Sequence, residues 1–429
     1  MSAVDQLRQM VPDYWQLKPL RSVADYQVSN VDKLVLEGEE PVRLCNYVDV
    51  YHNEKVDLTL SFMSATATAT EIERFGLRVG DVLITKDSES WEDIGIPTLI
   101  SETADDLVCG YHLAMIRPNP DQIEGEFLLR CIQAKPVGVQ LELAANGITR
   151  FGIPKGAIGS LAIPVPPISA QKQIVRYIAV QTQVIDNLLE AKQNLLKLLA
   201  EKRRTVVAEA VMRGLDRAAP SRPFGIDWLG DIPAHWEVRR LATLFAEKDE
   251  RNEPELPLLE VSINTGVSVR QFSTNQIEGT AADFNTYKVA RKGSIAFNKM
   301  RMWQGAVGVT PTDGLISPDY VVAAPSPEID AAFAGLLFRT PAFSAECARN
   351  SQGITWDRLR LYWDGFRDIS IGLPPLKEQQ QISEQITSEV LKIDKLASAT
   401  ERSIALLKER RSALIAAAVT GQIHIPEAA

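Results

Sequence analysis

The segment IPVPPISAQKQI, which begins at Ile163, returns at Ile371 as IGLPPLKEQQQI, and this repeat limits the possible folds more than any other feature. Without a gap, the Pro-Pro pair at 166–167 falls on the pair at 374–375. The register continues into LLAEKRRTVVAEAV at position 198 and LLKERRSALIAAAV at position 406, so the separation stays at 208 residues. One segment is therefore duplicated, and the chain is built as two halves.

The part of each copy that follows the Pro-Pro pair has the pattern of a coiled-coil helix. From Ser169 to about Arg213 there is no Pro or Gly, and apolar residues recur at alternating steps of four and three. The two predicted seams consist of Ile174, Ile178, Ile185, Leu188, Leu195, Leu199 and Val206, and of Ile382, Ile386, Ile393, Leu396, Leu407 and Leu414. Polar interruptions at Gln181, Lys192 and Lys202 are expected to fix the register. Each segment is predicted to be a helix of roughly 40 residues, about 60 Å long.

The remaining stretches, at about 14–163 and 236–371, carry short Val/Ile/Leu runs punctuated by Gly, Pro, Asn and Asp, which indicate strands joined by turns. They repeat one another only at landmarks: YWQLKPL and HWEVRRL, GDVLITKD and GSIAFNKM, NGITR and QGITW. The separations are 221, 213 and 206 residues, and they settle at 208 in the helices. Each stretch is predicted to be a mixed α/β (α+β) module, called module 1 and module 2 below.

Composition limits the class of protein further. A chain of 429 residues with 45% hydrophobic content is long enough for two or three packed domains. There is no apolar run of about 20 residues and no signal-peptide core, so a cytoplasmic protein without a membrane span is expected. Four separated cysteines and four histidines show no ligand spacing, which favours reduced thiols and no metal. The net charge of −9 lowers the expectation of nucleic-acid binding but does not exclude it, because a local basic patch is enough.

No catalytic motif is present in the sequence. The Pro-Pro pairs lack the preceding Asn or Asp and the following aromatic residue of an amino-methyltransferase loop, and no GxxxxGK[ST] phosphate loop occurs. SPDY at 317–320 lacks the Glu-x-Lys that a metal nuclease would supply. No catalytic residue is therefore predicted.

Two stretches in each module combine cations, aromatic rings and amides at the ends of predicted strands, a mixture suited to phosphates and base edges. Solvated loops with one anchoring Trp explain the same residues about equally well. The candidate DNA-contacting residues are Lys86, Asp87, Ser88, Trp91, Thr149, Arg150, Lys299, Arg301, Trp303, Gln304, Thr355, Trp356 and Arg358. The charge clusters EKRR at 201 and KERR at 409 are, by default, solvated helix faces.

Taken in order, these features resemble the specificity (S) subunit of type I restriction-modification systems over nearly the whole chain. The marks are DWLGDIPAHWEV at the start of module 2, the two GIT landmarks, the two Pro-Pro helix starts followed by Gln-x-x-Ile, and the terminal LLKERRSALIAAAVTGQI. Each mark is weak alone. Four marks in the right order, with the helix starts duplicated, are specific.

The resemblance implies two target recognition domains that each read half of a split site in double-stranded DNA. Two long helices would pair antiparallel between them with a pseudo-twofold axis. The implied boundaries are 1–163 for the first domain, 164–215 for the first spacer helix, 216–371 for the second domain and 372–429 for the second helix. Two modification subunits would dock on the helices, joined by two restriction subunits. The chain itself would be non-catalytic and hold no cofactor, because S-adenosylmethionine, ATP and Mg would be bound by these partners. The helix residues expected to bind partners are Gln171, Gln173, Lys202, Arg203, Gln379, Gln381, Arg410 and Arg411.

One departure and two alternatives accompany this resemblance. Between Trp15 and Ser160 there are 22 acidic and 13 basic residues, so the DNA-facing surface of module 1 must be narrow or completed by partners. A specificity subunit of a methylation-only or type IIB-like system would have the same DNA role with other partners. A coiled-coil scaffold that binds only proteins is the alternative from another class, and its affinity would not depend steeply on salt.

Overall fold

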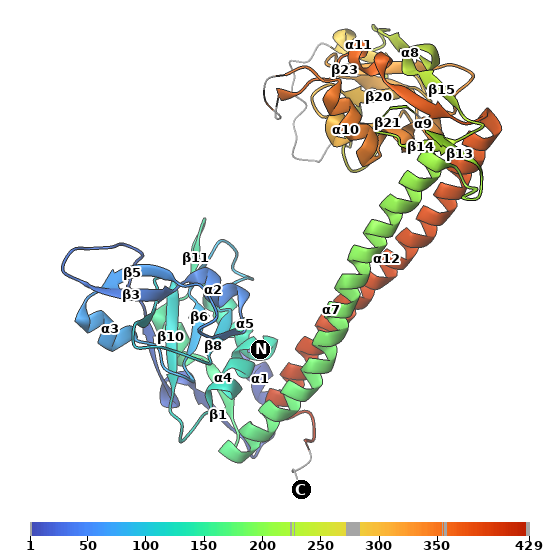
Figure 1. Cartoon of the computed structure of the whole chain (residues 1–429). Coiled ribbons are helices and arrows are strands. Elements are labelled where there is room, and N and C mark those ends of the chain that lie inside the picture. Colours follow the sequence, from blue (N-terminus) through green and yellow to red (C-terminus); the bar gives the residue numbers. More distant parts are fainter. Residues whose placement is uncertain are drawn as a thin grey trace. The chain divides into compact units, whose positions relative to one another are not determined.

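The computed structural model describes residues 2–223, 225–226, 228–271, 284–353, 355 and 358–425. Its contacts divide the chain into two compact units. Unit 1 contains Met1–Gln193 and Glu401–Ala429, and unit 2 contains Asn194–Thr400. Each unit holds one module together with parts of both long helices (Figure 1).

Module 1 is built around a five-stranded sheet in the order β2-β10-β6-β8-β4, with a three-stranded sheet β5-β3-β9 beside it. Its helices are α1 (Ala3–Met10), α2 (Tyr47–His52), α3 (Ala69–Phe75), α4 (Gly125–Gln133), α5 (Lys135–Ala144) and α6 (Lys155–Ser160). Its strands are β1 (Gln16–Pro19), β2 (Ala24–Val28), β3 (Glu40–Cys45), β4 (Lys55–Val56), β5 (Met63–Ala67), β6 (Val82–Thr85), β7 (Asp87–Ser88), β8 (Pro97–Ile100), β9 (Leu107–Cys109), β10 (Leu113–Pro118), β11 (Phe151–Gly152) and β12 (Ala162–Val165).

Module 2 has a four-stranded sheet in the order β16-β23-β20-β21, accompanied by two-stranded pairs. Its helices are α8 (Leu241–Leu244), α9 (Ala331–Phe338), α10 (Pro341–Arg349) and α11 (Trp363–Asp368), with 3-10 turns η2 (Phe284–Thr286) and η3 (Met302–Gln304). Its strands are β13 (Ser221–Pro223), β14 (Asp231–Pro233), β15 (Glu237–Arg240), β16 (Phe245–Lys248), β17 (Leu259–Ser262), β18 (Gly266–Val269), β19 (Lys288–Ala290), β20 (Ile295–Asn298), β21 (Val307–Val309), β22 (Gly314–Ile316), β23 (Tyr320–Pro325) and β24 (Ser370–Leu373).

The central strand of each module is buried on both faces. Successive side chains of a strand point to opposite faces. Accordingly, Val82 and Ile84 of β6 belong to one core cluster and Leu83 belongs to another. In β20, Phe297 and Ala296 divide between two clusters in the same way. This is why the first three residues of each of the segments VLIT and IAFN are apolar and do not alternate with polar residues.

Two long helices follow the Pro-Pro pairs, as predicted: α7 (Ile168–Arg213) and α12 (Leu376–Val419). In unit 1 the start of α7 shares a core with the end of α12, through residues such as Ile178 and Val419. In unit 2 the end of α7 shares a core with the start of α12, where Val211 and Ile386 belong to one cluster. The two helices therefore run antiparallel.

The buried seam is narrower than the sequence pattern predicted. Ile185 and Ile393 are each 6% exposed, but Leu188 and Leu396 are 46% and 48% exposed. The prediction that these two leucines lie on the buried seam is wrong, because a single partner helix covers only a narrow stripe of each helix. The predicted polar interruption Gln181 is exposed, whereas its neighbour Thr182 is buried.

In each module an early strand pairs with the last strand. In module 1, β1 pairs antiparallel with β12. In module 2, β15, which follows the β13-β14 pair, pairs antiparallel with β24. Each last strand leads directly into a Pro-Pro pair and a long helix. The points where the chain enters and leaves a module consequently lie side by side.

Across the part of the chain that the structure describes, no helix is both long and apolar enough to cross a membrane. Among the same residues, no three His, Cys, Asp or Glu side chains gather as metal ligands would. All four cysteines are free and buried.

Candidate nucleic-acid interface

The two predicted stretches of module 1 lie side by side, although about 60 residues separate them in sequence. Strand β7 pairs with β11, with Ser88 opposite Phe151 and Asp87 opposite Gly152. The amide of Ile153 donates to the carbonyl oxygen of Lys86 at 2.9 Å. The loop that carries Lys86–Trp91 is thereby joined to the loop at 146–152, which carries Thr149 and Arg150.

Module 2 joins its own two stretches through the same contact. The amide of Leu361 donates to the carbonyl oxygen of Lys299 at 2.8 Å. The separation from Ile153 to Leu361 is 208 residues, and Lys86 to Lys299 is the 213-residue landmark separation. One local architecture is therefore used twice. Thr355 and Arg358 belong to this second loop, whereas the predicted Trp356 lies outside the described residues.

A glycine shapes the turn of both loops. Gly147 has φ of 149° and Gly353 has φ of 155°, a backbone region that favours glycine. A Cβ atom at Gly147 would lie 1.9 Å from the carbonyl oxygen of Arg150, and one at Gly353 would lie 2.7 Å from that of Arg358. The Gly of each GIT landmark is thus required by close backbone approach.

The charged groups of module 1 compensate one another inside the site. The Lys86 ammonium lies 2.9 Å from an Asp87 carboxylate oxygen, and His112 Nδ1 lies 2.6 Å from the same oxygen. Burial alone would raise the pKa of Asp87, but the hydrogen bonds from His112 and Lys86 outweigh it and hold the pKa below its ordinary value. Lys86 and Asp87 therefore hold the loop together, and Thr149, Arg150 and Trp91 are left as exposed candidates.

The corresponding loop of module 2 is more basic. Met300 stands where module 1 has Asp87, so the carboxylate that pairs with Lys86 in module 1 has no counterpart next to Lys299 in the sequence. Arg301 and Gln304 are exposed, and the buried Met302 anchors the turn η3 between them. The indole of Trp303 donates to the Met300 carbonyl oxygen at 3.0 Å, which fixes this ring beside the loop.

Two residues of this surface were not identified by the sequence pattern. Ile148 is 96% exposed at the tip of its loop, yet it reads as an ordinary apolar residue of the GIT landmark. Burial raises the pKa of the Tyr47 phenol, while a hydrogen bond to Ser88 and the charge of Arg150 act in the opposite direction, so this side chain belongs to the same surface. Tyr47 precedes the loop by about 40 residues, so no local pattern could have connected them.

Two of the helix residues expected to bind partners are buried instead. Gln171 is 0% exposed, and its amide donates to the carbonyl oxygens of Gln122 and Pro166, each at 2.9 Å. Its side-chain oxygen accepts from the Glu124 amide at 2.9 Å. These bonds tie the start of α7 to module 1, so the Gln171 side chain does not lie on a partner-facing surface.

Gln379 repeats this arrangement in unit 2. It is 0% exposed and donates to the carbonyl oxygens of Glu328 at 3.0 Å and Pro374 at 2.9 Å. Its oxygen accepts from the Asp330 amide at 2.8 Å. A buried amide clamp therefore holds each module on the helix that follows it.

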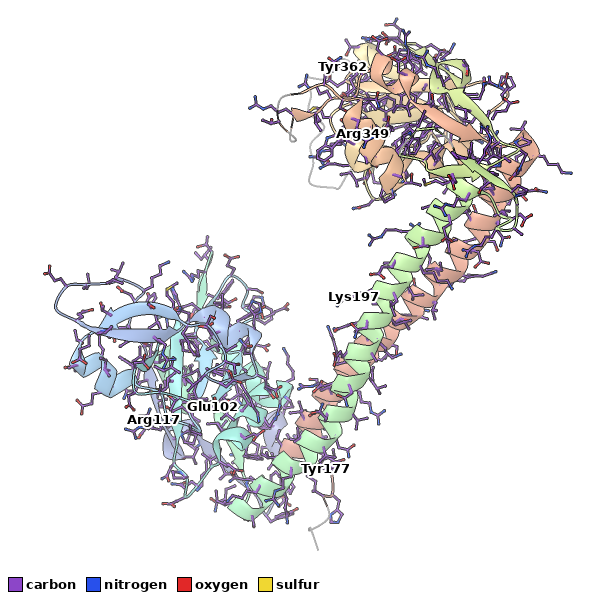
Figure 2. The ribbon with its side chains drawn as sticks, viewed as in Figure 1. Glu102, Arg117, Tyr177, Lys197, Arg349 and Tyr362 are labelled. Atoms are coloured by element: carbon purple, nitrogen blue, oxygen red, sulfur yellow. The ribbon has the colours of Figure 1, made fainter. Side chains whose placement is uncertain are left out.

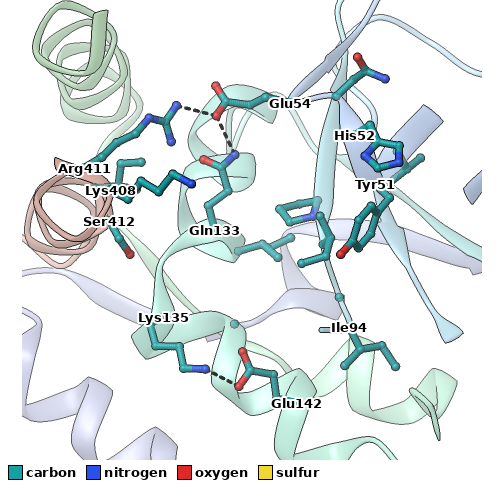
Figure 3. A pocket seen from close by; sticks show the side chains of 18 residues that line it. Tyr51, His52, Glu54, Ile94, Gln133, Lys135, Glu142, Lys408, Arg411 and Ser412 are labelled. Atoms are coloured by element: carbon teal, nitrogen blue, oxygen red, sulfur yellow. Dashed lines mark hydrogen bonds and ion pairs between the residues drawn. The ribbon is translucent and has the colours of Figure 1, made fainter. Parts of the chain in front are cut away.

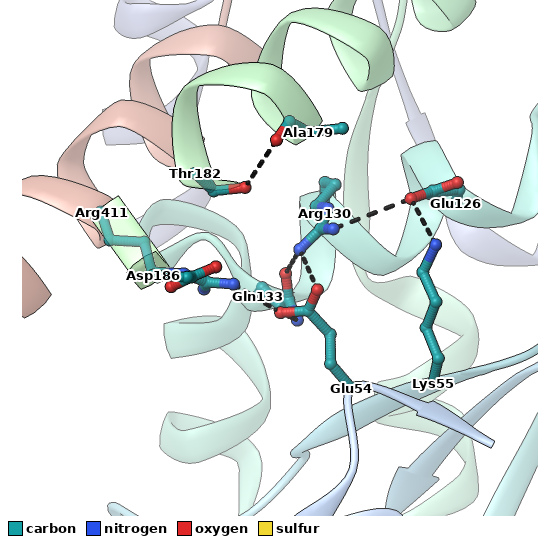
Figure 4. A network of polar contacts seen from close by, with 9 residues as sticks. All are labelled: Glu54, Lys55, Glu126, Arg130, Gln133, Ala179, Thr182, Asp186 and Arg411. Carbon is teal, nitrogen blue, oxygen red and sulfur yellow. Dashed lines mark hydrogen bonds and ion pairs between the residues drawn. The ribbon is translucent and has the colours of Figure 1, made fainter. Parts of the chain in front are cut away.

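Two more of the predicted partner residues form ion pairs between the helices. Arg411 Nε lies 2.9 Å from Asp186; both residues are drawn in Figure 4. Arg203 Nε lies 3.4 Å from Asp394, so the pair is duplicated at the same separation of 208 residues. Of the remaining candidates, Gln173 is half-buried. Lys202, Gln381 and Arg410 are exposed and stay available to a partner.

The landmark DWLGDIPAHWEV docks module 2 on α12. Trp236 is 2% exposed and its indole donates to one carboxylate oxygen of Glu378 at 3.1 Å. His235 Nε2 lies 2.8 Å from the other oxygen of this carboxylate. The landmark therefore positions the module and does not line the loop surface described above.

Comparison with known proteins agrees with this architecture. Residues 233–400 match the family model described as the type I restriction modification DNA specificity domain. The chain is 23% identical over 238 residues to a putative type I restriction enzyme MjaX specificity subunit from Methanocaldococcus jannaschii. That match covers 54% of this chain and 52% of the relative, so it spans about half the length of the curated relative.

Two solved structures share the fold over nearly the full chain. One, described in work on complex assembly and conformational transition of the type I R-M system, gives a TM-score of 0.71 at 16% identity and covers 96% of this chain and 99% of that chain. The other is the HsdS subunit from Thermoanaerobacter tengcongensis, with a TM-score of 0.55 at 18% identity and coverage of 96% and 98%.

These findings define the chain as a protein of two mixed α/β modules and two long helices, and the predicted fold class is confirmed. The resemblance drawn from the sequence is confirmed as well: the chain resembles the specificity subunits of type I restriction-modification systems.

Proposed function

We propose that this chain is the DNA sequence-recognition subunit of a type I restriction-modification complex. Each target recognition domain, 1–163 and 216–371, reads one half of a bipartite site. The spacer helices, 164–215 and 372–429, set the distance between the half-sites. The observation that carries the proposal is the duplicated site: the same two loops are joined by the same backbone contact in both modules, and gap-free copies of one helix follow them.

The exposed side chains of the loops have the chemistry that base readout requires. Arginine binds the O6 and N7 acceptors of guanine in the major groove, and glutamine pairs with the N6 and N7 edge of adenine. Arg301 and Gln304 supply these groups in module 2, and Lys299 contributes a phosphate contact. In module 1, Thr149 and Arg150 supply the polar contacts, and the exposed Ile148 suits the methyl group of thymine.

The helices offer two equivalent surfaces to partners. Leu188 and Leu396 are about half exposed, and Leu198 and Leu406 are 61% and 65% exposed. Each pair is related by the separation of 208 residues, so the chain presents the same apolar positions twice. Lys197, which precedes Leu198 on α7, is labelled in Figure 2.

This duplication favours two copies of one modification subunit, with two restriction subunits completing the complex. The modification subunits would bind S-adenosylmethionine, and the restriction subunits would bind ATP. The chain itself carries out no catalysis in this proposal, since its role is to select the DNA site.

The proposal is tested by exchanging module 1. Replacing residues 14–163 with the matching segment of another specificity subunit should change one half of the methylated sequence and leave the other half intact. The exchange is feasible because β1 pairs with β12, so the chain enters and leaves the module at neighbouring points. The measurement is a base-resolution methylation map of cells that carry the chimaera and its modification subunit.

The reciprocal exchange of residues 236–371 is the matched control, and it should change the opposite half of the site. If both halves change together in either chimaera, the modules do not read independently and the proposal is refuted.

A further inference from the structure

Each unit contains a groove beside its module, and the internal duplication relates residues of the two grooves. The unit 1 groove lies between module 1 and α12, and the unit 2 groove lies between module 2 and both long helices. In unit 1 the groove has a volume of about 460 Å³ and is lined by Glu54, Gln133 and Arg411 among others (Figure 3). In unit 2 the groove has a volume of about 580 Å³ and is lined by Arg203, Arg339 and Asn264 among others. The two grooves differ in charge.

In unit 1 the arginine of the groove, Arg411, is paired with a carboxylate of the same chain. Glu54 accepts from Arg411 at 2.9 Å, from Arg130 at 2.7 Å and from Gln133 at 3.2 Å (Figures 3 and 4). Burial would raise the pKa of Glu54, but the two arginines outweigh it and hold the pKa below its ordinary value. The Glu54 carboxylate thereby fixes module 1 to the end of α12.

In unit 2 the corresponding positions carry more positive charge. At the separation of 208 residues, Arg203 is the equivalent of Arg411, and Arg204 is the equivalent of Ser412. The residues whose amides bond to the buried glutamines, Glu124 and Asp330, are 206 residues apart. At this separation of 206, Arg339 is the equivalent of Gln133. Asn264 and Thr265 line this groove, and they bring no carboxylate.

Arg339 is held in place by neutral groups. Its Nη2 donates to the carbonyl oxygens of Ile263 at 2.9 Å and Asn264 at 2.6 Å. A Cβ atom at Gly266 would lie 2.6 Å from Arg339 Nη1, so the guanidinium is packed directly against the backbone. Burial and the neighbouring Arg203 lower the pKa of Arg339. Among the described residues, no carboxylate pairs with Arg339 or Arg204.

The floor of the unit 2 groove is apolar. Leu336, Val207 and Val390 are half-buried, and Leu391 is 54% exposed. Leu336 stands where unit 1 has Arg130. An apolar floor beside fixed arginines suits a protein segment better than a DNA backbone, because a phosphate backbone offers the floor no apolar partner.

We propose that the unit 2 groove binds an acidic segment of the modification subunit, with a carboxylate held by Arg203, Arg204 and Arg339 as Glu54 is held in unit 1, and an apolar side chain on Leu391. The identity of this partner rests on the function proposed above. Arginine–carboxylate pairs of this kind are charge-assisted and often bidentate. The two modification subunits consequently bind unequally: the one at unit 2 gains a contact that unit 1 makes internally.

The test uses the full chain and the purified modification subunit, with affinity and stoichiometry measured by calorimetry and native mass spectrometry. The double variant Arg204→Ser, Arg339→Gln copies the unit 1 residues Ser412 and Gln133 into unit 2. It should weaken one of the two binding events about 30-fold and leave the other unchanged, since loss of a buried charged partner costs about 2 kcal/mol or more. Arg349→Gln is the matched control, because this arginine is exposed in the same module but lies outside the groove.

A second variant, Asn264→Glu, supplies the missing carboxylate within the chain. It should fill the groove as Glu54 does, weaken the same binding event and leave the melting temperature of the chain no lower than that of the wild type. This variant keeps the proposal testable if the double variant folds poorly.

The outcomes separate the two proposals. A wild-type chain that binds no modification subunit refutes the proposed function, and this occupant with it. A wild-type chain that binds two copies, together with variants that bind both copies equally well, refutes only the groove proposal. Variants that bind the partner normally but lose affinity for a DNA duplex would assign the groove to phosphate and overturn the proposal.

Discussion

Replacing the buried clamp Gln379 with glutamate is expected to loosen module 2 from α12. The substitution keeps the shape of the side chain but removes both amide protons. The carbonyl oxygens of Glu328 and Pro374, which now accept at 3.0 and 2.9 Å, would face a carboxylate. The Asp330 amide would keep its acceptor. The net effect is therefore the loss of two donors and the burial of a charge.

The magnitude follows from these contacts. A buried group left without its hydrogen bond costs about 1–3 kcal/mol, so two unsatisfied carbonyls give about 2–6 kcal/mol. For a unit of this size, about 1 kcal/mol lowers the melting temperature by about 2–4 °C. Gln379→Glu should thus lower the melting temperature of unit 2 by at least about 4 °C. Gln381→Glu makes the same chemical change at an exposed position of the same helix and should have little effect.

The loss should also depend on pH. Burial raises the folded-state pKa of the introduced carboxyl above its unfolded value of about 4.3. The variant is therefore least destabilised below about pH 4.3. Its deficit relative to the wild type grows as pH rises through that value, and it levels off above the folded-state pKa.

The assay is thermal unfolding at several pH values, together with hydrogen exchange of α9, whose first turn follows the clamped Asp330. If Gln379→Glu and Gln381→Glu unfold at the same temperature and α9 exchanges equally in both, the clamp contributes nothing and the reasoning is refuted.

Three further predictions concern the loops and the helices. Lys299→Ala should reduce the salt dependence of DNA binding by about one phosphate contact, whereas Arg301→Ala should relax one base of one half-site by about 1–3 kcal/mol in a binding-site selection. Equal losses at all sites for both variants would contradict this division of roles. Gly147→Ala should disturb the module 1 loop and weaken DNA binding, while Gly156→Ala, where a Cβ meets nothing within 4 Å, should be neutral. Duplicating a heptad within 187–199 and within 395–407 should lengthen the helix pair by about 10 Å and widen the methylated spacer by roughly three base pairs. A methylation map that shows the original spacer length would refute the proposal that the helices set the distance between the half-sites.

The sequence predicted those parts of the structure that depend on local pattern. The helices α7 and α12 were predictable because long stretches without Pro or Gly carry a seam of apolar residues. The partly exposed Leu188 and Leu396 were not, because the width of the buried stripe depends on how much of each helix its neighbours cover. The burial of Gln171 and Gln379 also escaped prediction. The partners that tie them to the modules, Gln122 and Glu328, lie about 50 residues away, and a glutamine after a Pro-Pro pair looks like a surface residue.

The loop at 352–360 of module 2 is two residues longer than the corresponding loop at 146–152 of module 1. The position of this difference explains how the modules can diverge in sequence while the helices do not. In module 1, Asn146 and Gly152 exchange backbone hydrogen bonds at 3.1 and 2.9 Å. In module 2, Gln352 and Arg360 exchange them at 2.9 and 2.8 Å. The first pair spans six positions and the second spans eight, so the separation between modules changes from 206 to 208 inside this loop. Because each bridge closes its loop, the extra residues stay in the loop and the chain leaves in the same register. The segment that we propose to read DNA can therefore change in length and sequence without moving the last strand, the Pro-Pro pair or the buried glutamine behind it.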